Sequence, residues 1–221
     1  MPHAVVLSHD WIAHELGHLE PWFDRHAFTV TRVHRERPEP LPDADLLVVM
    51  GSPGSAADAF CTPPTAREIA EVGGWVAQGR PYLGLCLGAQ VLAAATGGSV
   101  RRMSTPFSGY VEMDRTSGAP PALDGPWLTW HEDALTAPAS SELLGRRDHA
   151  DLAFRVNRAW GLQPHVEVTP DIAERMLVQL DVRESQYALI VGVMRDHADR
   201  DAERAAALLD AFLEDVSATR E

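Results

Sequence analysis

The chain has 221 residues, of which 45% are hydrophobic and 23% are charged, and its formal net charge at pH 7 is −13. All 19 basic residues are arginine, and lysine is absent. Schiff-base enzymes, pyridoxal phosphate enzymes and Walker-type phosphate loops each need a lysine amine, so these three classes are excluded. The negative charge also opposes contact with phosphate backbones and anionic lipid, and we expect neither nucleic acid nor membrane as a partner.

The length predicts a single domain over residues 1–221, because α/β folds of this size commonly form one unit with a core that needs no disulfide or metal. The two cysteines, Cys61 and Cys86, form no disulfide framework and are judged as individual thiols. The early apolar run Ala4–Leu7 is too short for a signal peptide, and no run is long enough to span a bilayer. We therefore expect a cytoplasmic protein.

Short apolar runs alternate with segments of helical period, the pattern of a mostly parallel sheet covered by helices. In the first half the expected strands are Ala4–Ser8, Phe28–Val33, Leu46–Met50 and Tyr82–Cys86. The expected connections are a helix or loop over Trp11–Phe23, a proline-rich loop over Arg35–Asp43, and helices over Thr65–Ala77 and Gln90–Ala95. Thr65 is expected to cap its helix, with Glu68 as the reciprocal partner.

The second half is patterned less clearly. Residues 101–124 alternate weakly and predict antiparallel or edge strands. Two short strands are expected within Ala153–Gln163, around Asn157 and Arg158, and a one-faced apolar stripe predicts a helix over Asp199–Val216.

Residues Gly84–Gly88 have the form Gly-x-nucleophile-x-Gly between an expected strand and an expected helix. Such a turn is sharp and strained, and it exposes the middle side chain at the carboxyl end of the sheet. The N-terminal end of the following helix favours the thiolate of Cys86. We interpret Cys86 as a nucleophile rather than as a buried core cysteine.

A cysteine nucleophile needs a base, and the base needs an orienting group. His165 and Glu167 stand two residues apart, so in an extended stretch both side chains point to the same side. The carboxylate would then hold the imidazole in the tautomer that accepts the thiol proton. Cys86, His165 and Glu167 together form a candidate catalytic triad.

These residues carry a family resemblance. Residues 84–90 resemble the nucleophile motif of class I glutamine amidotransferases, and residues 160–167 resemble their Gly-x-Gln-Phe-His-Pro-Glu motif. Residues 50–55 resemble the Gly-Gly-Pro oxyanion loop of the family, and residues 130–133 resemble its Ser-His-Gly-Asp segment. The four motifs occur in the family's order between Leu46 and Leu177.

The resemblance implies a three-layer α/β/α, flavodoxin-like fold and a division of labour within the site. Cys86 would attack the carboxamide of glutamine, His165 would pass the proton to the departing ammonia, and Glu167 would orient His165. Backbone N–H groups of Leu87 and of the loop at Gly51 and Ser52 would bind the oxyanion. Gln90, Trp130 and His131 would hold the amino-acid end of the substrate. No cofactor is implied.

Three residues depart from the family pattern. Pro164 stands where an aromatic residue is usual, and Val166 stands where proline is usual. Ser52 replaces the second glycine of the oxyanion loop, which disfavours a positive φ at this position. None of these changes deletes a reacting group.

A competing motif lies near the N-terminus. His14–His18 reads His-Glu-x-x-His, which on a helix would place two imidazoles on one face for zinc. Asp24 lies at an offset suited to a third ligand. Zinc proteases build a sheet before this helix, whereas only about a dozen residues precede it here, so we interpret the segment as an ordinary part of the first βα unit and expect no metal.

The leading functional hypothesis is a glutaminase that supplies ammonia to a synthetase on another chain, since no residues remain in this chain for the synthetase. Residues 103–126 and the loop over Ala56–Pro64 are candidate docking surfaces. Two alternatives stay open: a free-standing γ-glutamyl peptide or amide hydrolase, and a non-catalytic binding or regulatory module with the same fold. Cys61, in a proline-rich loop, is interpreted as a spare thiol.

Overall fold

The computed structural model describes residues 1–37, 39–183 and 185–218. Within them the strands are β1 His3–Ser8, β2 Thr29–His34, β3 Leu46–Val49, β4 Tyr82–Leu85, β5 Ser99–Val111, β6 Asp114–Arg115, β7 Trp127–Thr136, β8 Glu142–Arg147, β9 Ala150–Val156 and β10 Ala159–Leu162. The helices are α1 Leu19–Arg25, α2 Pro63–Ala77, α3 Leu87–Ala95, the 3₁₀ turn η1 Pro121–Leu123, α4 Pro170–Gln179, α5 Ser185–Asp196 and α6 Ala198–Ala218.

The main sheet has the strand order β2-β1-β3-β4-β10-β9-β8-β6. The pairings from β2 through β10 are parallel, and those from β10 through β6 are antiparallel. The chain first places β2 on one side of β1 and then places β3 on the other side, so the order of strand addition reverses between β1 and β3. Parallel sheets of this kind bind ligands at the carboxyl ends of their strands. The mostly parallel sheet and its flavodoxin-like strand order confirm the predicted fold class.

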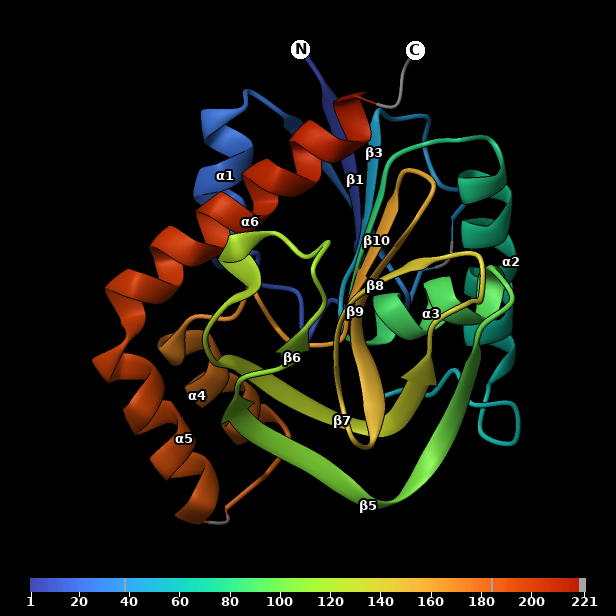
Figure 1. Ribbon diagram of the computed structural model, residues 1–221. Coiled ribbons are helices and arrows are strands. Elements are labelled where there is room, and N and C mark those ends of the chain that lie inside the picture. The colour runs from blue at the N-terminus through green and yellow to red at the C-terminus, as the bar shows by residue number, and fades with distance from the viewer. Residues whose placement is uncertain (38, 184, 219–221) are drawn as a thin grey trace.

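Helices cover both faces of this sheet, as Figure 1 shows, with α1 and α6 on one side and α2 and α3 on the other. Alternate residues of one strand reach opposite faces. Ala4 and Val6 pack with α1 and α6, whereas Val5 and Leu7 pack with α2. The inner strands β1, β3 and β4 are almost continuous buried runs because neither of their faces is left to water, whereas the edge strand β2 is partly exposed.

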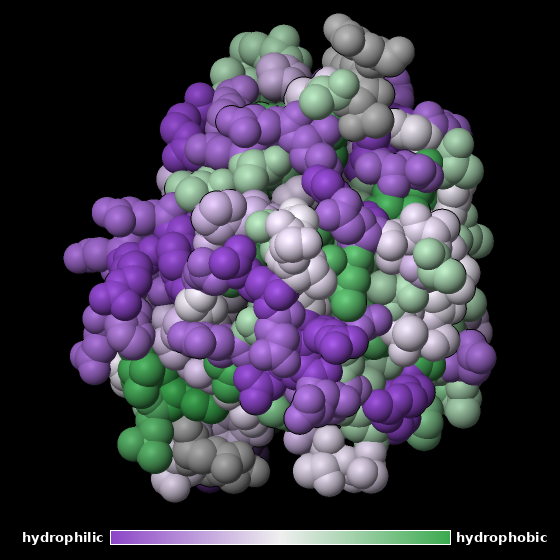
Figure 2. Space-filling model, viewed as in Figure 1, coloured by the Kyte–Doolittle hydropathy of each residue, from purple (hydrophilic) through white to green (hydrophobic). Residues whose placement is uncertain are grey.

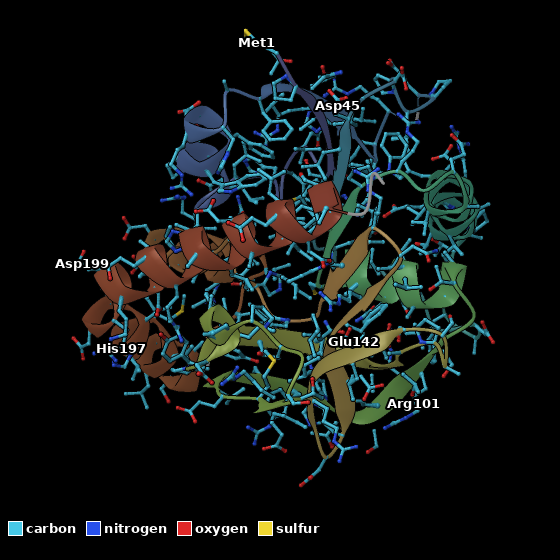
Figure 3. The ribbon with its side chains drawn as sticks, turned by 45° about the horizontal axis from the view of Figure 1, so that its top comes forward. Met1, Asp45, Arg101, Glu142, His197 and Asp199 are labelled. Atoms are coloured by element: carbon cyan, nitrogen blue, oxygen red, sulfur yellow. The ribbon has the colours of Figure 1, made fainter. Side chains whose placement is uncertain are left out.

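A separate two-stranded ribbon, β5 with β7, lies below the main sheet in Figure 1, with α4 and α5 beside it. Met1 and Asp45 precede parallel strands and lie at the opposite end of the molecule from Arg101 of β5 (Figure 3). The carboxyl ends of β3, β4 and β10 therefore point toward the β5–β7 ribbon.

The predicted strands and helices are confirmed in existence and order, mostly with shifts of one to three residues at their ends. The range Trp11–Phe23, expected as a helix or loop, is a loop up to His18 and becomes helical only from Leu19 in α1. The prediction for Thr65 is wrong, because α2 begins at Pro63 with Thr62 as its N-cap. Proline is favoured at the first helical position, where its missing N–H costs nothing. Thr65 lies within the helix, and Glu68 makes an ion pair with Arg35 instead of closing a capping box.

The sequence interpretation did not include β7, β8, α4 and α5. Residues 101–124 are confirmed as antiparallel strand over much of their length, although β5 pairs with β7 outside the main sheet. No helix among the described residues has both the length and the apolar composition needed to cross a membrane.

Candidate active site

Three loops meet at the carboxyl edge of the main sheet because β3, β4 and β10 are adjacent in the strand order. Gly51 and Ser52 follow β3, Cys86 follows β4, and His165 follows β10. A pocket of about 270 Å³ opens there and is lined by Ile12, Ala13, Ser52, Pro53, Gly54, Cys86, Gln90, Trp130, His131, Glu132, Asp133, His165, Met176, Leu180 and Val182. The predicted catalytic residues Cys86 and His165 thus face one cavity.

Cys86 occupies a strained turn, with φ 52° and ψ −107°, directly before α3. The flanking glycines are required by close approach of the backbone. A Cβ on Gly84 would lie 2.4 Å from the carbonyl oxygen of Gly88, and a Cβ on Gly88 would lie 2.2 Å from that of Val49. The strain predicted for the Gly-x-Cys-x-Gly segment is confirmed, and it falls on Cys86 itself.

His165 and Glu167 contact each other, with 2.8 Å between Nδ1 of the imidazole and Oε1 of the carboxylate. Both side chains are almost completely buried. The segment is irregular rather than a strand, and a single bridge between His165 and Leu128 anchors it. Pro164 has no amide hydrogen to donate to a ladder, which fits this irregular backbone. The side-chain pairing forms without a regular strand.

Burial disfavours a charged imidazole, but attraction to Cys86 and to Glu167 outweighs it and raises the pKa of His165 well above its ordinary 6.5. Because Nδ1 faces Glu167, the other ring nitrogen is left for Cys86. A protonated imidazole next to the pocket can give its proton to a leaving group.

The loop after β3 passes close to the other two. A Cβ on Gly51 would lie 3.0 Å from Cε1 of His165 and 3.5 Å from Cβ of Cys86, so a side chain there would intrude between them. Ser52 has no positive φ, so its replacement of glycine causes no backbone strain. Its hydroxyl oxygen accepts a hydrogen bond from the Gly54 N–H at 2.9 Å and lies 2.8 Å from Nε2 of His9.

One half of the pocket is polar and is built around Asp133, which is 2% exposed. The Ser55 hydroxyl donates to Oδ2 of Asp133 at 2.5 Å, and Nε of Arg102 lies 2.7 Å from Oδ1. The side-chain amide of Gln90 donates to Oε1 of Gln163 at 3.1 Å. Gln90 is therefore held in place at the pocket wall by neighbouring polar groups.

Trp130 and His131 of β7 also line the pocket. The carbonyl oxygen of Trp130 lies 3.7 Å from Sγ of Cys86, and its ring packs against Tyr187 of α5 at 5.1 Å between centroids. His131 is buried, and its Nδ1 donates to the carbonyl oxygen of Asp133 at 2.6 Å. Burial lowers the pKa of His131 to about 4 despite this hydrogen bond, so the ring is neutral at pH 7.

The other half of the pocket is apolar. Ile12 and Ala13 lie on the loop after β1, whereas Met176 belongs to α4 and Leu180 and Val182 follow it. Ile12 and Met176 belong to one buried apolar cluster with Leu128, the residue that pairs with His165. Leu128 therefore connects this apolar cluster to the backbone of His165.

The His-Glu-x-x-His segment is not helical, since α1 begins only at Leu19. Gly17 has φ +50°, and a Cβ there would lie 1.9 Å from the carbonyl oxygen of Glu167. The amide of His18 donates to that same oxygen at 2.9 Å. The segment therefore supports the backbone of Glu167, and His14 and His18 are not arranged on one helical face. Asp24 is exposed on α1.

Two residues that contact the site were not singled out by sequence as its neighbours. Arg35 follows β2 and donates to the carbonyl oxygens of Met50 and Gly51, and Glu68 of α2 binds its guanidinium. A signal for Glu68 existed, because a carboxylate stands on the buried stripe of α2. A buried carboxylate requires a partner. No comparable signal marks Arg35.

Trp75, Trp127 and Trp160 are buried in the core. Cys61 lies in the loop before α2 and is partly exposed, and its thiol lies 3.7 Å from the carbonyl oxygen of Thr62.

A cysteine on a strained strand-to-helix turn, beside a buried histidine and glutamate, is the arrangement found in α/β enzymes that use a cysteine nucleophile. The model of the family "Glutamine amidotransferase class-I" matches residues 8–183. The chain therefore belongs to the class I glutamine amidotransferase family, as the sequence motifs predict.

Curated relatives of the chain include GMP synthases. The chain is 32% identical over 129 residues to a glutamine-hydrolyzing GMP synthase of Thermus thermophilus, a match that covers 55% of this chain and 24% of the relative. It is 27% identical over 143 residues to one subunit of a glutamine-hydrolyzing GMP synthase of Sulfurisphaera tokodaii, covering 60% and 73%. The chain thus spans about a quarter of the length of the single-chain synthases.

Solved structures resemble the chain over nearly its whole length. A glutamine amidotransferase of Thermotoga maritima superimposes with a TM-score of 0.80 at 20% identity and covers 96% of this chain and 98% of its own. A glutamine amidotransferase of Methylobacillus flagellatus gives 0.78 at 22%, covering 96% and 94%. At these identities the likeness concerns the fold.

Proposed function

We propose that this protein hydrolyses the side-chain amide of glutamine through a thioester on Cys86. The observation that carries the proposal is the placement of Cys86 against the buried His165–Glu167 pair in a pocket at the carboxyl edge of the sheet. Membership of the class I glutamine amidotransferase family supports this choice of substrate.

In the proposed reaction the sulfur of Cys86 forms a bond to the carboxamide carbon, and the carbonyl electron pair moves onto oxygen. The N–H groups of Leu87 and of the Gly51–Ser52 loop bind that oxyanion. The C–N bond then breaks, and the nitrogen takes a proton from His165 and leaves as ammonia. Water, deprotonated by His165, hydrolyses the thioester to glutamate and free Cys86.

The roles that we propose for the other site residues follow from their positions in the pocket. Glu167 holds His165 through Nδ1. Gln90 and His131 line the pocket on its polar side, and Trp130 lines it beside His131 on β7; we place the amino-acid end of the substrate against these three residues.

We further propose that the ammonia passes to a synthetase on another chain. Similarity to one subunit of a GMP synthase supports a separate partner, without identifying it. The proposed contacts are residues 103–126 and the loop over Ala56–Pro64, where Phe60 is 52% exposed. Figure 2 shows a further apolar area near α4 and α5, where Val178, Leu189 and Val193 are exposed. It adjoins the helix that supplies Met176 to the pocket.

The test is ammonia release from glutamine by the wild type, by Cys86→Ser and by Cys61→Ser, which is the matched control because Cys61 lies outside the pocket. We expect release that is lost in Cys86→Ser and retained in Cys61→Ser. The absence both of turnover and of a Cys86 adduct with a glutamine-like electrophile would favour the non-catalytic module instead.

A second candidate is a free-standing hydrolase of γ-glutamyl amides with larger amines. The apolar wall of Ile12, Met176, Leu180 and Val182 favours it, because an apolar lining of the pocket suits a larger apolar amine as the leaving group. A higher kcat/KM for a γ-glutamyl anilide than for glutamine, reduced by Met176→Glu, would select this candidate. Faster turnover of glutamine would select the glutaminase.

A further inference from the structure

Arg35 lies directly after β2, yet its side chain reaches the loop that follows β3. Its backbone amide donates to the carbonyl oxygen of Ser8 at 2.9 Å, which fixes the residue at the end of β1. The side chain is only 10% exposed. The guanidinium is therefore a buried charge at the edge of the candidate active site.

The guanidinium makes two pairs of hydrogen bonds. Nε and Nη2 donate to the two carboxylate oxygens of Glu68, each at 2.9 Å. Nη1 donates to the carbonyl oxygen of Gly51 and Nη2 to that of Met50, each at 3.0 Å. Glu68 is itself 7% exposed, so the ion pair is shielded from water, and its bidentate geometry fixes the plane of the guanidinium.

The hydrogen bond from Arg35 to the carbonyl oxygen of Gly51 fixes the direction of the Ser52 N–H, which belongs to the same peptide group. The described residues contain no cis peptide bond, and in a trans peptide the carbonyl oxygen and the amide hydrogen point in opposite directions. Because the oxygen of Gly51 is held toward Arg35, the N–H of Ser52 must point away from Arg35. The bond to Met50 constrains the N–H of Gly51 in the same way.

The reacting groups lie on the side of this loop that faces the pocket. The space beside Gly51 contains Cε1 of His165 and Cβ of Cys86, and Ser52 lines the pocket with them. The contacts of the Ser52 hydroxyl with His9 and Gly54 hold its side chain but not the orientation of this peptide. The carbonyl bonds from Arg35 supply that constraint.

We propose that Arg35, held by Glu68, is a positioning residue that keeps the oxyanion-binding N–H groups of Gly51 and Ser52 directed at the substrate. This inference rests on the proposed amide hydrolysis. The oxyanion exists only after the sulfur of Cys86 has bonded to the carboxamide carbon, so the alignment lowers the barrier to that step with little effect on substrate binding.

The test compares Arg35→Lys and Arg35→Ala with Arg37→Ala, a control at an exposed arginine two residues further on. Lysine keeps the charge for Glu68 but not the fork that reaches both carbonyl oxygens. We expect kcat for glutamine to fall about 10²- to 10³-fold in both Arg35 variants, as for the loss of one oxyanion donor, with KM changing by less than about threefold. Arg37→Ala should match the wild type.

Two further measurements distinguish a positioning role of Arg35 from a general loss of structure in the variants. Alkylation of Cys86 by iodoacetamide displaces iodide from a saturated carbon and needs no oxyanion hole, so its rate should stay near that of the wild type. Guanidinium chloride well below denaturing concentration should restore part of the kcat of Arg35→Ala, whereas equal sodium chloride should not.

Full kcat in Arg35→Lys would overturn the inference while leaving the proposed function intact. An equal fall in kcat and in alkylation in Arg35→Lys, without rescue of Arg35→Ala, would also overturn it, because a structural role alone would then suffice. A wild type that turns over no amide would overturn the proposed function and this inference together.

Discussion

Nδ1 of His165 lies 2.8 Å from Oε1 of Glu167, at a place where both side chains are almost entirely shielded from water. The distance is short enough for the carboxylate to fix the ring orientation and the tautomer. Burial strengthens the interaction, because no solvent screens it.

Replacement of Glu167 by glutamine should therefore reduce kcat far more than it reduces the stability of the fold. A neutral amide neither stabilises the imidazolium nor fixes the tautomer, and we expect kcat to fall about 10²- to 10⁴-fold. Steady-state kinetics of Glu167→Gln measure the effect, with Glu20→Gln on the exposed face of α1 as the control. Turnover within threefold of the wild type would show that His165 does not depend on this carboxylate.

Stability should depend on pH through His131. Its pKa is lowered from 6.5 to about 4, so between these values the unfolded chain binds a proton that the folded chain does not. The stability contributed by the neutral ring is fully present above pH 6.5 and is lost as the pH falls through about 4. The charged or titratable groups that act on it are His149, His165 and Asp133.

Urea unfolding at pH 7 and at about pH 4.5 measures this contribution. We expect His131→Gln to lose about 2 kcal/mol less stability between the two pH values than the wild type loses. The difference between the proteins isolates His131, since the other titrating groups are common to both. Equal losses in the two proteins would contradict the buried neutral ring.

The glycines around Cys86 should not tolerate a methyl group. A Cβ on Gly88 would lie 2.2 Å from the carbonyl oxygen of Val49, so Gly88→Ala should destabilise the fold by about 3 kcal/mol and disturb Cys86. Gly74 of the same α2–α3 layer has nothing within 4 Å of its Cβ position and is exposed. Gly74→Ala should stabilise the protein by about 0.5–1 kcal/mol. Denaturant unfolding of both variants compares them, and equal effects would argue against the close approach.

We expect the segment His14–His18 to act through its backbone contacts with Glu167 rather than by binding a metal ion. Gly17→Ala should lower turnover and stability together, because φ is positive there and the Cβ would strike the carbonyl oxygen of Glu167. His14→Ala should stay near the wild type, and a chelator should leave turnover unchanged. Activity that is abolished by the chelator and restored by zinc would revive the metal interpretation.

The nucleophile turn is predictable from sequence because its residue pattern is local, although the close approach of Gly88 to Val49 of β3 is not. Gly84, Cys86 and Gly88 stand within five residues, and the flanking strand and helix show in the period of their apolar residues. The predicted helix start at Thr65 is wrong because Thr62 and Pro63 form an alternative start nearby, which places Glu68 on the buried face rather than in a capping box.

The amino-acid sequence alone specifies the strands and helices of the first half, the Gly-x-Cys-x-Gly turn, the spacing of His165 and Glu167, and through them the family, whereas β7, β8, α4 and α5 were not predicted. The contacts of Arg35 with Gly51 and of Ser55 with Asp133 emerge only from the folded arrangement of the chain. Periodicity and turn chemistry act within a short window of residues and can be recognised there. Side-chain pairs between distant residues depend on which strands lie side by side, and that order is set by packing of the whole chain.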